Sequence, residues 1–226
     1  MHPNRPRQLI GVLGTHTEVG KTYVTSRWLA ALRQQGFKAN VRKPVQSFNA
    51  ADLTTDAKQL AAATGEALTA VCPPHRCYPL AYAPPMAAEI LGYPRIQLDD
   101  LVKELNWQEH CEIGVVETVG GPRSPIAHDG DSVELLLRLQ PDRVLLVADA
   151  GLGTLNAVRM SLAAIAPLNG VVFLNRYRES DELHRLNRAW LADAYGIEAL
   201  IDLPALTACL TKTHEATGYR PQASAR

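Results

Sequence analysis

The stretch GVLGTHTEVGKTY, residues 11–23, decides the fold. Its glycines, and the Gly20-Lys21-Thr22 near its end, are typical of a loop that wraps phosphate groups between a β-strand and an α-helix. The usual pattern has four residues between its first glycine and GK, whereas five separate Gly14 from Gly20 here. Strand, loop, lysine and helix nevertheless follow in order, so the stretch predicts a nucleotide site rather than a chance turn.

Each part of such a loop has an expected role. Backbone N–H groups and the start of the helix converge on the phosphates. We expect Lys21 to reach the outer phosphates and the Thr22 hydroxyl to bind Mg²⁺. The residues expected to contact the nucleotide here are Gly14, Thr15, His16, Glu18, Val19, Gly20, Lys21 and Thr22.

The composition is that of an ordinary globular protein, with 226 residues, of which 46% are apolar and 20% charged. The 23 basic and 23 acidic residues cancel, which argues against a nucleic-acid partner. No apolar run approaches the ~20 residues of a membrane span and no leader is apparent, so we expect a cytoplasmic protein without a membrane partner. We expect one domain over residues 1–210 and, because apolar residues are few beyond it, a mobile tail over residues 211–226.

The segment CPPHRC, residues 72–77, places two cysteines and a histidine close together. A structural zinc ion usually needs four ligands, and no second cluster of cysteine and histidine completes this one. The segment therefore predicts a proline-bent loop with incidental thiols in preference to a metal site.

Short, continuously apolar runs alternate with amphipathic stretches along the chain. Continuous apolar runs indicate strands buried on both faces, as in a parallel sheet. The alternation predicts a P-loop-type α/β domain, a doubly wound, mostly parallel sheet flanked by helices on both faces, with sites at the carboxyl ends of the strands. The expected strands are 8–14, 38–45, 112–117, 143–150, 170–175 and 198–203, and the expected helices are 20–35, 54–64, 97–109, 154–166 and 181–195.

The loop and the motifs after it resemble the dethiobiotin synthetase family. That family extends its loop as GT-x-T-x-VGKT, which corresponds to GTHTEVGKT at residues 14–22. The resemblance covers roughly residues 8–205, with the motifs in the family's order. The later matches are KPVQS (43–47), TTDAKQLAAATG (54–65), YPLAYAPPMAAEILG (78–92), VVETVGG (115–121), ADAGLGTLNAV (148–158) and FLN (173–175).

The resemblance implies an ATP- and Mg²⁺-dependent ligase that closes a ureido ring on 7,8-diaminopelargonate with CO₂, giving dethiobiotin, ADP and phosphate in biotin biosynthesis. One substrate amine takes up CO₂ as a carbamate, a carbamate oxygen attacks the γ-phosphate, and the second amine displaces phosphate. Such a transfer needs charge neutralisation and alignment more than a protein nucleophile. A homodimer with the substrate site near its interface is also implied.

Positions that match the family's motifs acquire expected roles. The implied catalytic residues are Lys21, Lys43 and Thr17. The implied substrate contacts are Thr17, Lys43, Ser47, Gly120 and Gly121, with Gly153, Thr154, Leu155 and Asn156 as a helix start that receives the substrate carboxylate. Asn175 matches the adenine-reading position and Leu203–Pro204 the loop beside the base. Thr22, Asp56 and Glu117 can supply oxygen ligands for Mg²⁺.

Simpler roles are open for some of these residues. Lys43 could be a solvated charge at a strand end, and Asp56 or Asp52 could cap the helix that follows. Glu117 ends an apolar strand, where an unpaired carboxylate would be costly, so a functional role is favoured there.

The chain departs from the family in one loop. The family's EGAGG reads ETVGG here, so Thr118 and Val119 replace a glycine and an alanine, and Arg123 adds a positive charge. Glycines in this loop allow backbone amides to approach a substrate closely. Either the change is neutral, or the enzyme acts on a different amine or diamine.

Other functions of the P-loop group compete with this interpretation. A partitioning or cell-division ATPase would carry an early lysine, as K-G-G-x-G-K-T, where this chain has His16. A cobyrinate-type amide ligase would need a glutaminase domain, for which the chain is too short. A catalytically silent relative is the third alternative, for which the ETVGG loop is the one hint.

Overall fold

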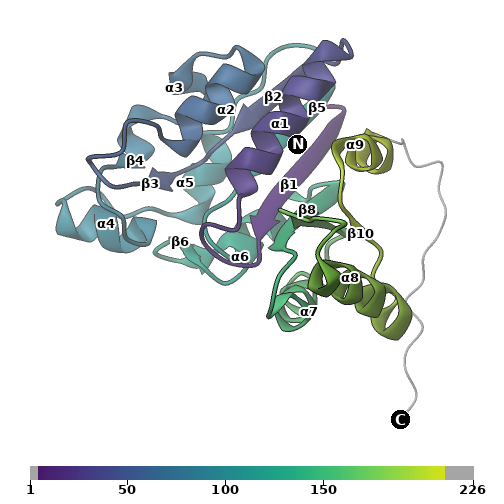
Figure 1. Ribbon diagram of the computed structural model, residues 1–226. Helices are drawn as coiled ribbons and strands as arrows, with labels where there is room; N and C mark the ends of the chain where they lie inside the picture. Colours follow the sequence, from purple (N-terminus) through teal and green to yellow (C-terminus); the bar gives the residue numbers. More distant parts are fainter. Residues whose placement is uncertain (1–4, 212–226) are drawn as a thin grey trace.

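Strand β1 (Gln8–Gly14) lies inside a six-stranded sheet of order β10-β9-β8-β1-β5-β2 in which every pair of neighbours is parallel. The computed structural model describes residues 5–211. Of the expected tail, Thr211 is the last residue of helix α9, and residues 212–226 lie outside the described part. The expected doubly wound parallel sheet is confirmed (Figure 1).

The elements follow the expected alternation along the chain. The other strands of the sheet are β2 (Ala39–Arg42), β5 (Ile113–Glu117), β8 (Arg143–Asp149), β9 (Gly170–Asn175) and β10 (Ala199–Leu200). Two small sheets pair β3 (Gln46–Ser47) with β4 (Cys77–Tyr78), and β6 (Pro125–Ala127) with β7 (Gly130–Asp131). The helices are α1 (Lys21–Gln34), α2 (Asp56–Thr64), α3 (Leu68–Val71), η1 (Pro74–Arg76), α4 (Pro84–Ile90), α5 (Leu98–Lys103), α6 (Ser132–Leu139), α7 (Thr154–Ala164), α8 (Glu182–Tyr195) and α9 (Leu203–Thr211).

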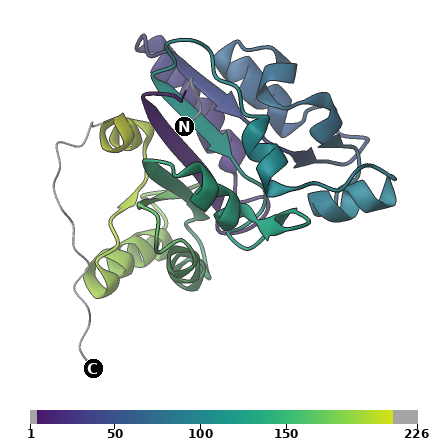
Figure 2. The same ribbon diagram turned by 180° about the vertical axis from the view of Figure 1, so that it is seen from behind.

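Helices cover the sheet on both faces, which Figures 1 and 2 show from opposite sides. One buried cluster joins the sheet to α1, α2 and α9, through side chains such as Trp28, Leu60 and Leu206. The other joins it to α4, α5, α6, α7 and α8, through side chains such as Leu101 and Leu136. Burial on both faces explains why the strands are continuously apolar.

The register brings the carboxyl ends of the strands, where the expected site residues lie, to one edge of the sheet. Val12 of β1 lies opposite Glu117 of β5, and Asp149 of β8 lies opposite Asn175 of β9. The chain moves from β1 to one side, reaching β2 and β5, and then crosses to β8 on the other side. Such a reversal of strand order opens a crevice at the carboxyl edge.

Several segments differ from the expectations. The helix expected at 97–109 spans only Leu98–Lys103. The strand expected at 198–203 is only Ala199–Leu200, because Leu203 and Pro204 begin α9. Asp202 caps that helix by accepting a hydrogen bond from the backbone N–H of Ala205 at 2.8 Å, and proline is tolerated in a first helical turn, where backbone N–H groups lack intrahelical partners. Leu203 and Pro204 therefore belong to a helix and not to the expected loop, and their place beside the base stays a prediction. Helix α6, which was not expected, begins with a capping box between Asp131 and Glu134.

Among residues 5–211, no helix is both long and apolar enough to cross a membrane.

Candidate functional site

A large cleft opens at the carboxyl ends of β1 and β2, with a volume of about 1020 Å³. The loop after β1, the start of α1, the segment after β2 and the loop after β5 line it. Of the expected site residues, the cleft brings together nine, which are Thr17, Glu18, Gly20, Lys21, Thr22, Lys43, Ser47, Asp56 and Gly120. These nine are about half of the nineteen residues expected to contact phosphate, metal or substrate, and they share one space.

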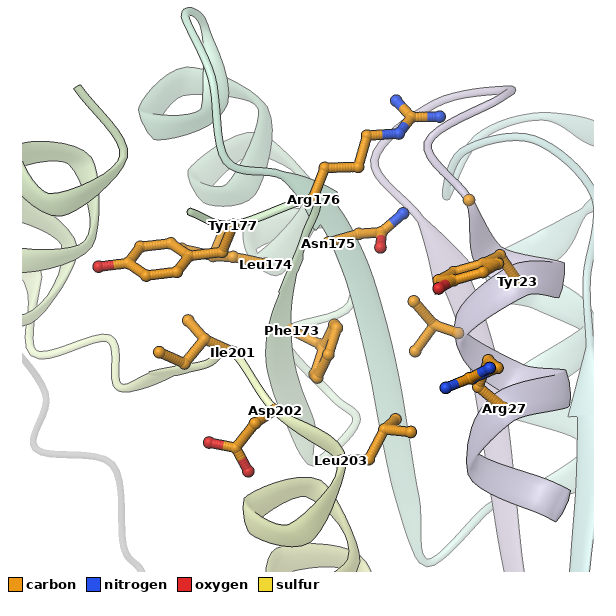
Figure 3. A pocket seen from close by; sticks show the side chains of 12 residues that line it. Tyr23, Arg27, Phe173, Leu174, Asn175, Arg176, Tyr177, Ile201, Asp202 and Leu203 are labelled. Atoms are coloured by element: carbon orange, nitrogen blue, oxygen red, sulfur yellow. The ribbon is translucent and has the colours of Figure 1, made fainter. Parts of the chain in front are cut away.

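A smaller cavity of about 510 Å³ adjoins the cleft (Figure 3). Tyr23 and Arg27 of α1 form one wall, and Phe173 and Asn175 of β9 face them across the cavity. Leu203, at the start of α9, also lines it. Gly20 is common to both cavities, so the phosphate loop connects them.

A buried ionic cluster forms the floor of the cleft. Lys43 Nζ donates to Asp56 Oδ2 at 2.7 Å and to Glu117 Oε1 at 2.9 Å, and Thr22 Oγ1 donates to the same Glu117 oxygen at 2.7 Å. The Glu117 side chain is 0% exposed and that of Lys43 1%. The other Glu117 oxygen, Oε2, is buried with no hydrogen-bond partner within residues 5–211. One oxygen of this carboxylate thus has no partner within the described residues, and Glu117 lies beneath the cleft without lining it.

The pKa values of the two lysines, Lys21 and Lys43, are shifted in opposite directions. Burial lowers the pKa of Lys21 to about 8, and the positive charge of Lys43 adds to this effect. Burial would also lower the pKa of Lys43, but the charges of Asp56 and Glu117 outweigh it and raise that pKa above its ordinary value. Lys43 in turn holds the pKa of Asp56 below its usual range. Lys43 and Asp56 therefore keep their charges near neutral pH, and the pKa of Lys21 lies nearest to neutrality of the three.

The helix-capping alternative for the two aspartates does not hold. Thr55 is the N-cap of α2, and its side chain accepts from Lys58 N. Asp56 is the first helical residue and pairs with Lys43, while Asp52 accepts from the backbone N–H of Asn49 at 3.1 Å. Lys43 is buried, so the solvated-charge alternative is also wrong.

Several residues of the phosphate loop shape it without lining either cavity. A Cβ on Gly14 would lie 2.7 Å from Val19 Cγ1 and 2.9 Å from His16 O, so only glycine allows the loop to fold back here. Val19 is part of the core, and the Thr15 backbone N–H donates to Val147 O at 2.9 Å. His16 is exposed, with Nδ1 2.6 Å from Thr17 O. These four residues support the loop from beside or beneath it.

The expected substrate residues divide into two groups. Thr17, Lys43, Ser47 and Gly120 line the cleft, and Ser47 Oγ donates to Tyr82 O at 2.6 Å. Gly121 packs against the loop, because a Cβ there would lie 2.9 Å from Thr15 O. The helix start of residues 153–156 lines neither cavity within the described chain, and Thr154 Oγ1 donates to Asp149 O at 2.6 Å. Its role as a carboxylate site therefore stays a prediction.

Of the residues that depart from the family's pattern, Val119 lines the cleft, whereas Thr118 and Arg123 make contacts outside it. Thr118 is 0% exposed, and both its backbone N–H and its hydroxyl donate to Val12 O, at 3.0 and 2.9 Å. The threonine thus ties β5 to β1 and points away from the cleft. Arg123 pairs with Asp131 at 2.9 Å outside the cleft lining. These contacts favour the neutral explanation for both residues.

Substituting Arg123 with Ala is expected to leave the KM for a substrate bound in the cleft within about twofold of wild type, because exposed substitutions away from a site have small effects. Steady-state kinetics on the two proteins would measure it. A large rise in that KM would instead place Arg123 in contact with the substrate.

Two residues that line the cavities were not singled out from the sequence. Arg176 lines both, and its guanidinium donates to Asp149 Oδ2 at 3.0 Å and to Glu18 O at 3.1 Å. Gln46 lines the cleft and accepts from the backbone N–H of Ala57 at 3.1 Å. Both are adjacent to a predicted residue, Asn175 or Ser47, and a position one residue from a strand end was the signal that could have identified them.

Comparison with known proteins extends this description. A family model described as AAA domain matches residues 8–213. The ATP-dependent dethiobiotin synthetase BioD of Rhodococcus erythropolis is 31% identical over 199 residues, covering 86% of this chain and 87% of that protein. The enzyme of the same name from Anaeromyxobacter dehalogenans is 34% identical over 199 residues, covering 85% and 88% respectively.

Solved structures are similar in fold. A plasmid partition protein from Borrelia burgdorferi superimposes with a TM-score of 0.53 over 88% of this chain and 90% of that chain, at 12% identity. The signal recognition particle receptor FtsY from Elizabethkingia anophelis gives a TM-score of 0.50 over 87% of this chain and 58% of that chain, at 15% identity. At such identities the likeness concerns the parallel α/β fold alone.

Proposed function

Because this chain belongs to the family of ATP-dependent dethiobiotin synthetases, we propose that it carboxylates 7,8-diaminopelargonate with CO₂ and closes the ureido ring of dethiobiotin, releasing ADP and phosphate. The chain is an ATP-dependent ligase that forms carbon–nitrogen bonds in biotin biosynthesis. The identities of the substrates and of the product are the part that we propose. We also propose that it works in the cytoplasm.

The observation that carries the proposal is the junction of the two cavities at Gly20. A nucleotide with its base beside Asn175 would extend past Gly20, so that its phosphates meet the loop and the start of α1. Its outer phosphate would then approach Lys21 and Thr22, above the ionic cluster. The remaining part of the cleft, beside Ser47, has room for the amine substrate.

The residues on the cleft floor fit Mg²⁺, which prefers oxygen ligands. We propose that the Thr22 hydroxyl and the carboxylates of Asp56 and Glu117 hold it, and the partnerless Oε2 of Glu117 supports this assignment. Bound there with ATP, the ion would neutralise charge on the outer phosphates. Lys43 keeps the two carboxylates in place from the opposite side.

We assign the chain's own side chains the following tasks. The Lys21 ammonium binds the γ-phosphate and stabilises the charge that develops on its oxygens during transfer. The Thr17 and Ser47 hydroxyls, at the cleft, orient the carbamate for in-line attack. No protein nucleophile is required, because the carbamate oxygen of the substrate attacks phosphorus.

The direct test is to incubate the purified chain with ATP, radiolabelled bicarbonate and 7,8-diaminopelargonate. Equal amounts of labelled dethiobiotin, ADP and phosphate are the expected result. ATP binding without dethiobiotin would overturn the substrate assignment, and turnover on another diamine would then identify the true substrate class. Turnover that depends on DNA or lipid rather than on an amine would favour the partitioning-type switch.

A homodimer is proposed on the surface formed by α7 and α8, which pack against each other. Leu152, Met160 and Trp190 are 92%, 66% and 57% exposed there, a run of large apolar side chains typical of an interface. Residues 153–156 begin α7 and would lie at such an interface. Light scattering on wild type and on Trp190→Glu would test it, and an unchanged monomeric mass for both would contradict it.

Replacing Arg176 with Ala is expected to raise the KM for ATP about tenfold with little change in kcat, as for loss of a charged hydrogen bond used in binding. The guanidinium lies between the base cavity and the phosphate cleft. Steady-state kinetics would measure the effect. The matched control is Arg178→Ala, because Arg178 pairs with Asp181 and lines neither cavity. Equal KM values for Arg176→Ala and wild type would remove Arg176 from the nucleotide site.

ATP binding is also expected to weaken as pH rises through the pKa of Lys21, about 8. Below that pH the amine is charged and attracts phosphate, and above it the amine is neutral, so Kd should rise about tenfold per pH unit. Calorimetric titrations between roughly pH 7 and pH 9.5 would follow the change. Lys21→Arg should show no such rise, because guanidinium stays protonated. A flat profile for wild type would contradict the assignment.

A further inference from the structure

Two cysteines lie side by side next to the cleft. Cys72 follows α3 and is buried, and Cys77 begins β4 and is half-buried. Their Sγ atoms lie 3.5 Å apart, on either side of the short helix η1. Both sulfurs also approach the carbonyl oxygen of Pro73, at 3.8 and 3.5 Å. The fold therefore turns the CPPHRC segment into a pair of facing thiols.

The surroundings shift the pKa values of the two thiols in opposite directions. The hydrogen bond with Cys72 lowers the pKa of Cys77 to about 6, and Gln46 Nε2 donates to the Cys77 sulfur at 3.2 Å. The same hydrogen bond, together with burial, raises the pKa of Cys72 above its ordinary value. These surroundings favour loss of the Cys77 proton before that of Cys72. This division is typical of an attacking cysteine and a resolving cysteine.

Cys77 is connected to the site through one side chain. It pairs with Gln46 in the small sheet of β3 and β4. The Gln46 side chain bonds Cys77 through Nε2 and the Ala57 backbone N–H through Oε1. Ala57 follows Asp56, whose carboxylate belongs to the ionic cluster. A change at the Cys77 sulfur thus reaches the start of α2 through Gln46.

We propose that Cys72 and Cys77 form a modification site for peroxides, which oxidise the pair to a disulfide and so disturb the Gln46 contact with α2. The Cys77 thiolate attacks one peroxide oxygen, the O–O bond breaks, and the released hydroxide takes a proton to become water. The Cys72 sulfur then attacks the resulting sulfenic acid, an S–S bond forms, the S–O bond breaks, and the Cys72 proton leaves with the second water. Two thiols are oxidised by two electrons, and one peroxide is reduced to two waters.

Closing the disulfide requires movement. A disulfide bond is about 2.05 Å long, so the sulfurs must approach each other by about 1.5 Å from their 3.5 Å separation. The Cys77 sulfur then carries no thiolate to accept from Gln46. Because small displacements of a positioning group reduce catalysis strongly, we expect turnover to fall on the order of 10-fold in the oxidised protein and to recover with dithiothreitol.

The test treats the reduced full-length protein with a small excess of hydrogen peroxide, blocks free thiols with iodoacetamide and identifies the modified peptides by mass spectrometry. We expect an internal 72–77 disulfide, with Cys111 and Cys209 alkylated as built-in controls. Burial raises the pKa of Cys111 to about 11, so its thiol should react slowly with peroxide and still be free when iodoacetamide is added. In Cys72→Ser, Cys77 should instead accumulate as a sulfenic acid that dimedone traps.

Activity provides the second measurement. Peroxide should inhibit wild type and Cys209→Ser alike, while Cys77→Ser and Cys77→Ala should be insensitive. First oxidation at Cys111 or Cys209, or no 72–77 disulfide, would overturn the site. A complete disulfide with unchanged turnover would overturn its link to Gln46. The mass measurement does not depend on the proposed dethiobiotin reaction. Failure of that reaction can therefore be distinguished from failure to form the disulfide.

Discussion

Replacing Lys21 with Ala is expected to lower amine-dependent ATP turnover by on the order of 1,000-fold, the range seen when a preorganised charge is removed from a transition state. Lys21 is 6% exposed, begins α1 and lines the cleft beside Thr22. Its ammonium is the one cation of the loop that can meet a terminal phosphate. Without it, ATP binding measured by calorimetry should also fall below detection.

Lys103→Ala is the matched control for Lys21→Ala, because Lys103 is exposed in α5 and lines neither cavity. It should keep wild-type turnover. Circular dichroism on both variants would establish that each is folded. If Lys21→Ala retains wild-type turnover while folded, Lys21 has no part in phosphoryl transfer and the proposed arrangement of ATP is wrong.

The second large effect concerns stability. Lys43→Met should lower the free energy of unfolding by ~3–5 kcal/mol, because removing one partner of a buried ion pair leaves the other charge uncompensated. The Lys43 and Glu117 side chains are 1% and 0% exposed, so water cannot replace the lost ammonium. Urea unfolding at neutral pH, followed by circular dichroism, would measure the loss.

A double variant tests the cause of that loss. Lys43→Met combined with Glu117→Gln should recover much of the stability, since the carboxylate that lacked a partner is then neutral. Lys103→Met, at an exposed position, should change stability by less than about 0.5 kcal/mol. Additive losses from the two single substitutions at Lys43 and Glu117 would show that the residues do not interact.

Much of this site followed from the sequence because strand ends are local features. A buried parallel strand has a readable apolar run, and the residue that ends it must lie at the carboxyl edge of the sheet. Lys43 and Glu117 were identifiable as strand-end residues for this reason, and both belong to the ionic cluster with Asp56. The roles expected of Lys43 and Asn175 came from the family resemblance and not from the local pattern.

Side-chain direction was not predictable, because it depends on tertiary contacts. Thr118 stood in a glycine-rich loop, where a neutral change and an altered substrate fit were both open, and its hydroxyl bonds Val12 O. Pro204 resembled a loop residue, but the Asp202 cap places it in the first turn of α9. Arg176 joins both cavities through contacts with Asp149 and with Glu18, which is 158 positions away in the chain. Contacts over such separations leave no periodic pattern in a sequence.

In the proposed arrangement of ATP, with the base beside Asn175, the amide of this residue would influence which nucleobase is accepted. Its Nδ2 donates to Val19 O at 3.0 Å, so this side chain braces the phosphate loop. Its oxygen points into the cavity, as Figure 3 shows, while Nδ2 keeps one hydrogen besides the one donated to Val19 O. A fixed acceptor favours bases that carry an exocyclic amine and repels a keto oxygen, and the amide cannot flip to reverse this preference without releasing the loop. One side chain thus serves both base selectivity and loop rigidity. A substitution at Asn175 that changes the selectivity would also remove the hydrogen bond that holds the loop, and another contact would have to replace it.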